Sequence, residues 1–227
     1  MILKKPGTNI ETVVGDVFPN LGQIGTSLIF RQDSGLLIIE NAHPSSSSYT
    51  RIATINPFDY QLLKQTSTTS YSSSWCFGWD HDNNKIIAAI NTGNNIAIID
   101  ISDAGETATT LVTYTPGNYE DIMSIFRYNS EYHVLYYNGI YHRRALNGSS
   151  VAAFSSPFGV FTSAMCFDGV NRVWFSKWTN TVAARDLAVF QITSGSTPLV
   201  SIKTVQYPSS AISSTNVKVC IAGQFFR

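Results

Sequence analysis

The residues best suited to binding chemistry gather in one stretch of the chain, between Tyr132 and Arg144. Tyrosine and arginine are favoured at protein interfaces because they combine large, rigid surfaces with hydrogen bonding. The alternative is that these tyrosines pack between structural units and only their hydroxyls reach an edge. The candidate binding residues are Tyr136, Tyr137, Tyr141, His142, Arg143 and Arg144 here, and Trp79, Trp178 and Asp121 elsewhere.

Metal, cofactor and nucleophile motifs are not complete in this sequence. Asp80–Asn84 resembles the opening of a calcium loop, but Lys85 stands where that loop needs glycine and Asn91 where it needs an acid. We therefore expect a polar hairpin turn there, with calcium as the alternative. The four histidines show no zinc spacing, and the sequence holds neither a serine-hydrolase elbow nor a phosphate loop. We predict no metal and no cofactor.

The composition excludes several classes of partner. The 227 residues carry 15 basic and 15 acidic side chains, and charged residues make up 13% of the chain. A nucleic-acid binder would show a basic surplus, so we expect no nucleic-acid partner. No apolar run approaches the roughly 18 residues that a membrane span needs, so we expect no membrane insertion. We also see no secretory signal, so we expect the protein in a virion or outside the cell after lysis, with the cytoplasm as the alternative.

The elements that must position these residues are short strands. Apolar runs rich in Ile, Val, Phe and Tyr alternate with turns rich in Gly, Asn, Asp and Ser. One run recurs about every 40 to 55 residues, which is the length of a four-stranded propeller blade. Its copies are Leu28–Phe30, Trp75–Phe77, Ser124–Phe126, Met165–Phe167 and Val219–Ile221.

The repeat predicts an all-β, five-bladed β-propeller with one blade completed by both termini. The blades are expected at about 25–70, 71–118, 119–160, 161–209, and 210–227 plus 1–20. The alternative is a β-sandwich or jelly roll, which would also show short strands. Cys76, Cys166 and Cys220 hold equivalent places in three blades, so we expect small buried apolar residues there, not metal ligands.

One stretch carries a resemblance to a known repeat. Asn94–Ser102, and more loosely Leu187–Thr193, is similar to the third strand of the surface-layer-type YVTN propeller repeat. What this resemblance implies is architecture alone, with no catalytic or binding residue.

In such a ring Glu120 and Asp121 would stand near the channel, while equivalent positions of the other blades carry no acid. Glycoside hydrolysis needs two carboxylates, so the sequence predicts that the protein is not an enzyme. We expect a non-catalytic structural or interaction module of a virus or phage particle, at a tail, spike or vertex, acting in assembly or host-surface attachment. Its partners would be other structural proteins and cell-surface glycan. A carbohydrate-binding, lectin-type propeller is the alternative, and a small hydrolase the third interpretation.

Overall fold

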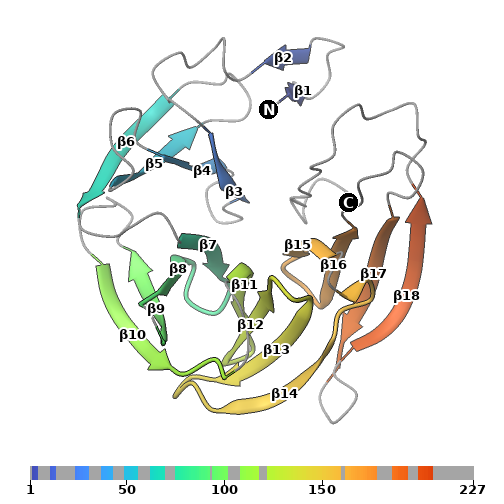
Figure 1. Cartoon of the computed structure of the whole chain (residues 1–227). Coiled ribbons are helices and arrows are strands. Elements are labelled where there is room, and N and C mark those ends of the chain that lie inside the picture. The colour runs from blue at the N-terminus through green and yellow to red at the C-terminus, as the bar shows by residue number, and fades with distance from the viewer. Residues whose placement is uncertain are drawn as a thin grey trace.

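A computed structural model gives the fold of this chain (Figure 1). It describes residues 2–4, 11–13, 24–30, 37–42, 49–55, 62–69, 75–92, 94–101, 108–117, 122–159, 162–177, 186–193 and 199–206, with most side chains from Cys76 onward. The regular elements in these ranges are β-strands. Among the same residues there is no helix of the length and apolarity required to cross a membrane.

The described strands form four consecutive antiparallel units of four strands each. Blade 1 consists of β3 (Ile24–Phe30), β4 (Leu37–Ala42), β5 (Tyr49–Ile55) and β6 (Leu62–Thr69). Blade 2 consists of β7 (Trp75–Asp80), β8 (Lys85–Asn91), β9 (Ile96–Ile101) and β10 (Ala108–Tyr114). Blade 3 consists of β11 (Ile122–Tyr128), β12 (Glu131–Tyr136), β13 (Ile140–Ala145) and β14 (Ser150–Ser155). Blade 4 consists of β15 (Thr162–Phe167), β16 (Arg172–Lys177), β17 (Asp186–Ile192) and β18 (Leu199–Gln206).

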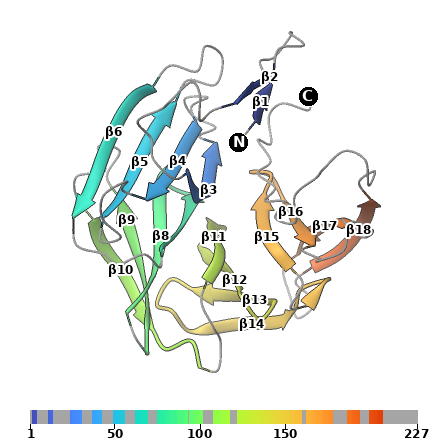
Figure 2. The same ribbon diagram turned by 45° about the horizontal axis from the view of Figure 1, so that its top comes forward.

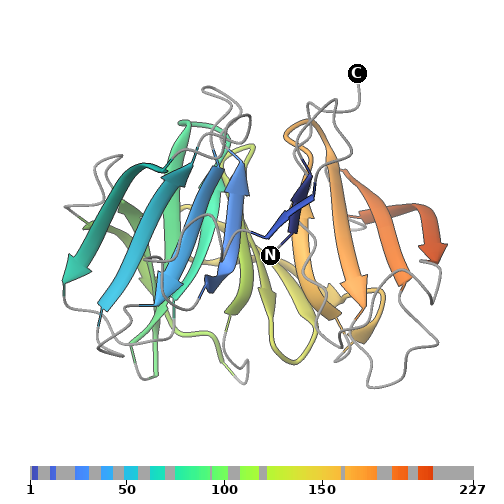
Figure 3. The same cartoon turned by 90° about the horizontal axis from the view of Figure 1, so that it is seen from above.

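The four units stand around a centre. Strands β3, β7, β11 and β15 lie innermost and β6, β10, β14 and β18 outermost (Figures 1 and 2). A further antiparallel pair, β1 (Ile2–Lys4) with β2 (Glu11–Val13), lies between blade 1 and blade 4 (Figure 3). The prediction of an all-β propeller is thus confirmed, and the sandwich alternative is set aside. The C-terminal part of the fifth predicted blade lies outside the described residues, so its completion by both termini stays a prediction.

The strands and turns of these blades follow from their residue types. Strand β8 is buried over five consecutive residues, because a blade packs against a neighbour on each face. Strand β11 turns back into β12 through Asn129 and Ser130, which have φ values of 53° and 60°. Two successive residues with positive φ make the tight turn whose twist matches that of paired strands.

Blades 2 and 3 share one eight-stranded sheet, because their innermost strands pair in parallel at one end. Gly78 allows this approach: a side-chain carbon there would lie 1.8 Å from the carbonyl oxygen of Ile125. Blade 4 contacts blade 3 through a hydrogen bond from the Met165 amide of β15 to Ser124 Oγ of β11, at 3.0 Å. The described centre of the propeller is therefore built from direct strand-to-strand contacts.

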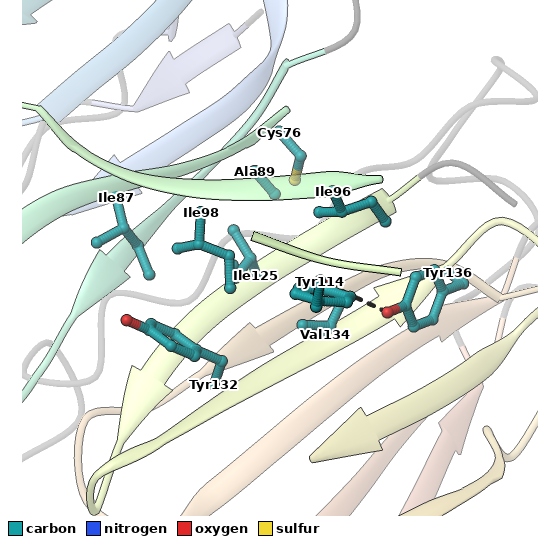
Figure 4. Packing of buried hydrophobic residues seen from close by; sticks show 10 residues of the cluster. All are labelled: Cys76, Ile87, Ala89, Ile96, Ile98, Tyr114, Ile125, Tyr132, Val134 and Tyr136. Atoms are coloured by element: carbon teal, nitrogen blue, oxygen red, sulfur yellow. Dashed lines mark hydrogen bonds between the residues drawn. The ribbon is translucent and has the colours of Figure 1, made fainter. Parts of the chain in front are cut away.

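The core consists of apolar layers between neighbouring blades. Between blades 2 and 3 lie Cys76, Ile87, Ala89, Ile96, Ile98, Tyr114, Ile125, Tyr132, Val134 and Tyr136 (Figure 4). Between blades 3 and 4 lie Phe126, Leu135, Tyr141, Met165, Phe167, Val173, Phe175 and Leu199. Cys76 is buried in the first layer, while Cys166 is half-buried and Cys220 lies outside the described residues.

Candidate functional site

The structure places most of the Tyr132–Arg144 segment inside the propeller. Tyr136 and Tyr141 are fully buried, and His142, Arg143 and Arg144 are nearly so. Tyr137 differs, because it lies in the turn between β12 and β13 and is 61% exposed. The packing alternative therefore describes five of the six candidate residues of this segment, and a binding role stays a prediction for Tyr137.

On the side facing blade 2, Arg144 is held by two tyrosines. Its guanidinium carbon lies 3.9 Å from the ring centroid of Tyr114, and its Nε donates to the Tyr136 hydroxyl at 3.3 Å. A second donor, Nη1, reaches the carbonyl oxygen of Gly148 at 2.8 Å. The two tyrosine hydroxyls also lie 3.1 Å apart (Figure 4). Burial raises the pKa of Tyr114, so its hydroxyl is neutral. Tyr114 thus links blade 2 to blade 3 through the Tyr136 hydroxyl and the Arg144 guanidinium.

On the side facing blade 4, Arg143 bridges two blades. Its Nε donates to Glu131 at 2.6 Å, and its Nη1 donates to the backbone oxygen of Thr193 at 3.2 Å. Tyr141 packs edge-on against Phe175 of blade 4 and hydrogen-bonds with His133. Because successive side chains of a strand point to opposite faces, β13 sends Tyr141 and Arg143 to blade 4 and Arg144 to blade 2.

Two histidines of this segment are buried and neutral. Desolvation lowers the pKa of His133 to about 3, and its Nε2 lies 3.3 Å from the Tyr128 carbonyl oxygen. Desolvation also lowers the pKa of His142 to about 4, and its Nε2 lies 2.6 Å from Ser150 Oγ. Both rings serve as uncharged hydrogen-bonding groups within blade 3.

Of the remaining candidate residues, the structure describes Trp79. Trp79 is buried in the layer of blade 2 that also holds Phe77 and Ile86. Trp178 and Asp121 lie outside the described residues. Trp79 is 4% exposed, and a binding role for it stays a prediction.

The Asp80–Asn84 turn connects blade 2 with blade 3. Asp80 accepts hydrogen bonds from the amides of Asp82 and Asn83, each at 3.0 Å, and from Arg127 Nη1 at 3.0 Å. The Asp82 carboxylate reaches blade 3, where it accepts the amides of Asn129 and Ser130 at 2.8 and 2.7 Å. These protein donors give both carboxylates a structural role, as expected for a polar turn.

His81 lies where blades 2, 3 and 4 meet. Its ring centroid is 4.7 Å from that of Phe167 and 6.3 Å from that of Phe126, in edge-on geometry. Burial lowers the pKa of His81 to about 4, against the opposing pull of Asp80, Asp82 and Asp168. Sequence reasoning missed this junction, because the contacts involve residues of separate blades.

A repeated feature on the outside of the ring was also missed. In each of the four described blades, the outermost strand has one extra residue opposite its neighbour, which makes a β-bulge. In blades 2, 3 and 4 this residue is aliphatic and exposed: Leu111 by 40%, Val151 by 47% and Ile202 by 47%. In blade 1 the backbone pairing places Leu63 at the bulge. No local sequence motif predicts these bulges, because the position of a bulge depends on the register between two paired strands.

Comparisons with known proteins show the fold. No family model and no curated protein matches the chain. A solved protein from Lactobacillus plantarum matches at 16% identity and a TM-score of 0.52, over 82% of this chain and 56% of that one. An exo-β-1,3-galactanase from Phanerochaete chrysosporium matches at 11% and 0.50, over 76% and 48%. A GH43 glycoside hydrolase with an engineered active site matches at 10% and 0.50, over 74% and 37%.

These matches correct the prediction that the protein is not an enzyme, and they leave the YVTN-type resemblance untested. The chain was expected not to be an enzyme, but the galactanase and the GH43 hydrolase share its fold, so this architecture accommodates catalysis. The absence of local catalytic motifs does not exclude an enzyme, because a propeller can assemble a site from residues of several blades. The present chain spans 37% to 56% of the length of the three structures, and at these identities they show the fold alone. The YVTN-type resemblance stays a prediction within the confirmed propeller fold.

Proposed function

We propose that this propeller is a structural interaction module that joins neighbouring subunits of a larger assembly through its outermost strands. The observation that carries the proposal is the exposed aliphatic bulge repeated in blades 2, 3 and 4. Leu111, Val151 and Ile202 lie on three different outer edges, so they offer similar contacts in different directions around the ring. Several modest apolar contacts of this kind suit a subunit held among several neighbours.

The chemistry of the outer strands supports the same proposal. Strands β10 and β14 contain no charged residue, and their exposed positions carry Thr, Ser, Ala and single aliphatic residues. Interfaces combine an apolar centre with hydrogen-bonding groups and are depleted in charge. The distinctive Tyr, His and Arg side chains of blade 3 are largely engaged in the interior, which leaves the described outer strands as the surface for partners.

We further propose a virus or phage particle as this assembly, with the protein at a tail, spike or vertex. Support comes from the neutral, sparsely charged sequence and from the outward aliphatic residues. The carbohydrate-binding alternative gains no support from Trp79, which is buried.

The test is particle incorporation. Intact particles from the native source should contain the protein at a fixed copy number. A triple variant, Leu111→Asp, Val151→Asp and Ile202→Asp, should be lost from the particles while its circular dichroism spectrum matches that of the wild type. Val170→Asp is the matched control, because Val170 is 59% exposed but lies in the β15–β16 turn, away from the outer strands. The proposal is wrong if no particle contains the protein, or if the triple variant is incorporated as well as the control.

A further inference from the structure

One outer strand, β10, combines an uncharged sequence with several β-branched residues. Strand β10 is Ala-Thr-Thr-Leu-Val-Thr-Tyr, with five of its seven residues exposed. It has no lysine, whereas the outer edges of blades 1 and 4 contain Lys64 and Lys203. Lysine on an edge strand is a common device against pairing with other chains. Strand β10 therefore has less protection than β6 or β18.

The backbone of β10 has one open side. It is the terminal strand of the eight-stranded sheet and pairs with β9 alone among the described strands. An edge of this kind presents N–H and C=O groups that another extended strand can satisfy. Four of its residues are β-branched, which favours a paired strand over an irregular loop: Thr109, Thr110, Val112 and Thr113.

We propose that two copies of this chain associate by antiparallel pairing of their β10 edges. The strand is complementary to itself. Thr109 and Thr113 stand two residues on either side of Leu111, so pairing about Leu111 sets threonine opposite threonine. Such pairs stabilise a sheet, and Thr110 opposite Val112 is a β-branched pair. With no charge on β10 and a net charge of +0 on the chain, two copies meet without electrostatic repulsion.

Among the four described outer strands, β14 is the second without charge, and it is a poorer candidate for the same role. Strand β14 has six residues, of which Val151 is the one β-branched side chain, and its bulge occurs at the second residue. Self-pairing of β10 also closes by a two-fold axis, because each copy uses the same edge once. The inference therefore predicts a dimer and not an open fibre.

The experiment is the solution mass of the full chain across a wide range of concentration, measured by light scattering after size exclusion with a reductant present. The wild type should reach twice the 25.0 kDa of one chain. Leu111→Lys should halve this mass, because two lysines would meet across the axis. Ile202→Lys is the matched control, since Ile202 is also an exposed bulge residue but lies on the edge that already carries Lys203. It should leave the mass at that of the dimer.

A second measurement guards against misfolding of the variants. Hydrogen exchange of the wild type should slow within β10 as concentration rises, with no change in β18. A chain that stays monomeric at every concentration overturns the inference, as does equal dissociation by both lysine variants. Monomers that pair only with a strand of another protein would also overturn it. The inference does not rest on the proposed particle, because a dimer absent from any particle would refute the proposed function alone.

Discussion

At the scale of single residues, Gly78 decides how closely blades 2 and 3 approach. The carbonyl group of Ile125 occupies the space that a side chain at this position would need, since a Cβ atom there would lie 2.7 Å from the carbonyl carbon. A contact with backbone cannot be relieved by a rotamer change. The parallel pairing of Trp79 with Phe126 and of Asp80 with Arg127 depends on this approach.

We therefore expect Gly78→Ala to lower the free energy of unfolding by more than about 4 kcal/mol, at the severe end of single substitutions. Urea denaturation followed by circular dichroism measures the change. Gly117→Ala is the control: Gly117 has a φ of 76° with open space around it, so alanine should cost about 1–2 kcal/mol from the backbone alone. Equal effects of the two variants would refute the steric explanation.

At the scale of elements, hairpin turns hold neighbouring blades together. The β7–β8 turn donates the His81 amide to the Arg127 carbonyl oxygen at 2.9 Å, and its Asp82 carboxylate accepts two amides of the β11–β12 turn. In the β15–β16 turn, Asp168 accepts the amides of Val170 and Asn171, just as Asp80 accepts those of Asp82 and Asn83 in the β7–β8 turn. The β7–β8 turn differs because its second carboxylate, Asp82, adds hydrogen bonds to the next blade.

This difference predicts where exchange will change. Asp82→Ala should remove about 1–3 kcal/mol of charge-assisted hydrogen bonding and speed hydrogen exchange at the amides of Asn129 and Ser130, in the next blade. In Asp168→Ala, the faster amides should be those of Val170 and Asn171. Residue-resolved exchange by NMR measures both. If Asp82→Ala left the Asn129 and Ser130 amides unchanged, the inter-blade link would be disproved.

At the scale of the whole molecule, packing of blades against each other keeps three histidines uncharged. His81, His133 and His142 are desolvated by neighbouring strands and turns, and each pKa lies below the ordinary value of 6.5. The unfolded chain therefore binds more protons than the folded chain as the pH falls below that value. The contribution of these neutral histidines to the free energy of unfolding is complete above about pH 6.5 and is lost as the pH drops towards 4.

We expect the free energy of unfolding to fall steadily from pH 6.5 to pH 4, by about 1.4 kcal/mol per pH unit for each histidine that stays neutral in the fold. Urea denaturation at a series of pH values measures the slope. His133→Gln keeps a polar side chain but cannot titrate. The free energy of unfolding of this variant should therefore fall with pH less steeply than that of the wild type, by about 1.4 kcal/mol per pH unit. Stability that rose on acidification over this interval would contradict the assignment.

The sequence by itself determined the strands, their grouping into repeated units and the propeller fold. Apolar runs and turn residues act locally, so strands such as Lys85–Asn91 and turns such as Asn129–Ser130 can be recognised without their neighbours. The alternation of side chains along β12 and β13 allowed their tyrosines to be either interior or exposed. Sequence could not choose, because that choice depends on which face each neighbouring blade covers.

Only the tertiary structure decided how the distinctive residues are used. It placed Arg144 over Tyr114 and joined Asp82 to a turn of the next blade, although these partners are far apart in the chain. It also turned Leu111, Val151 and Ile202 outward at bulges, which follow from the register between paired strands. Contacts between blades and strand register are non-local properties, so no run of neighbouring residues encodes them alone.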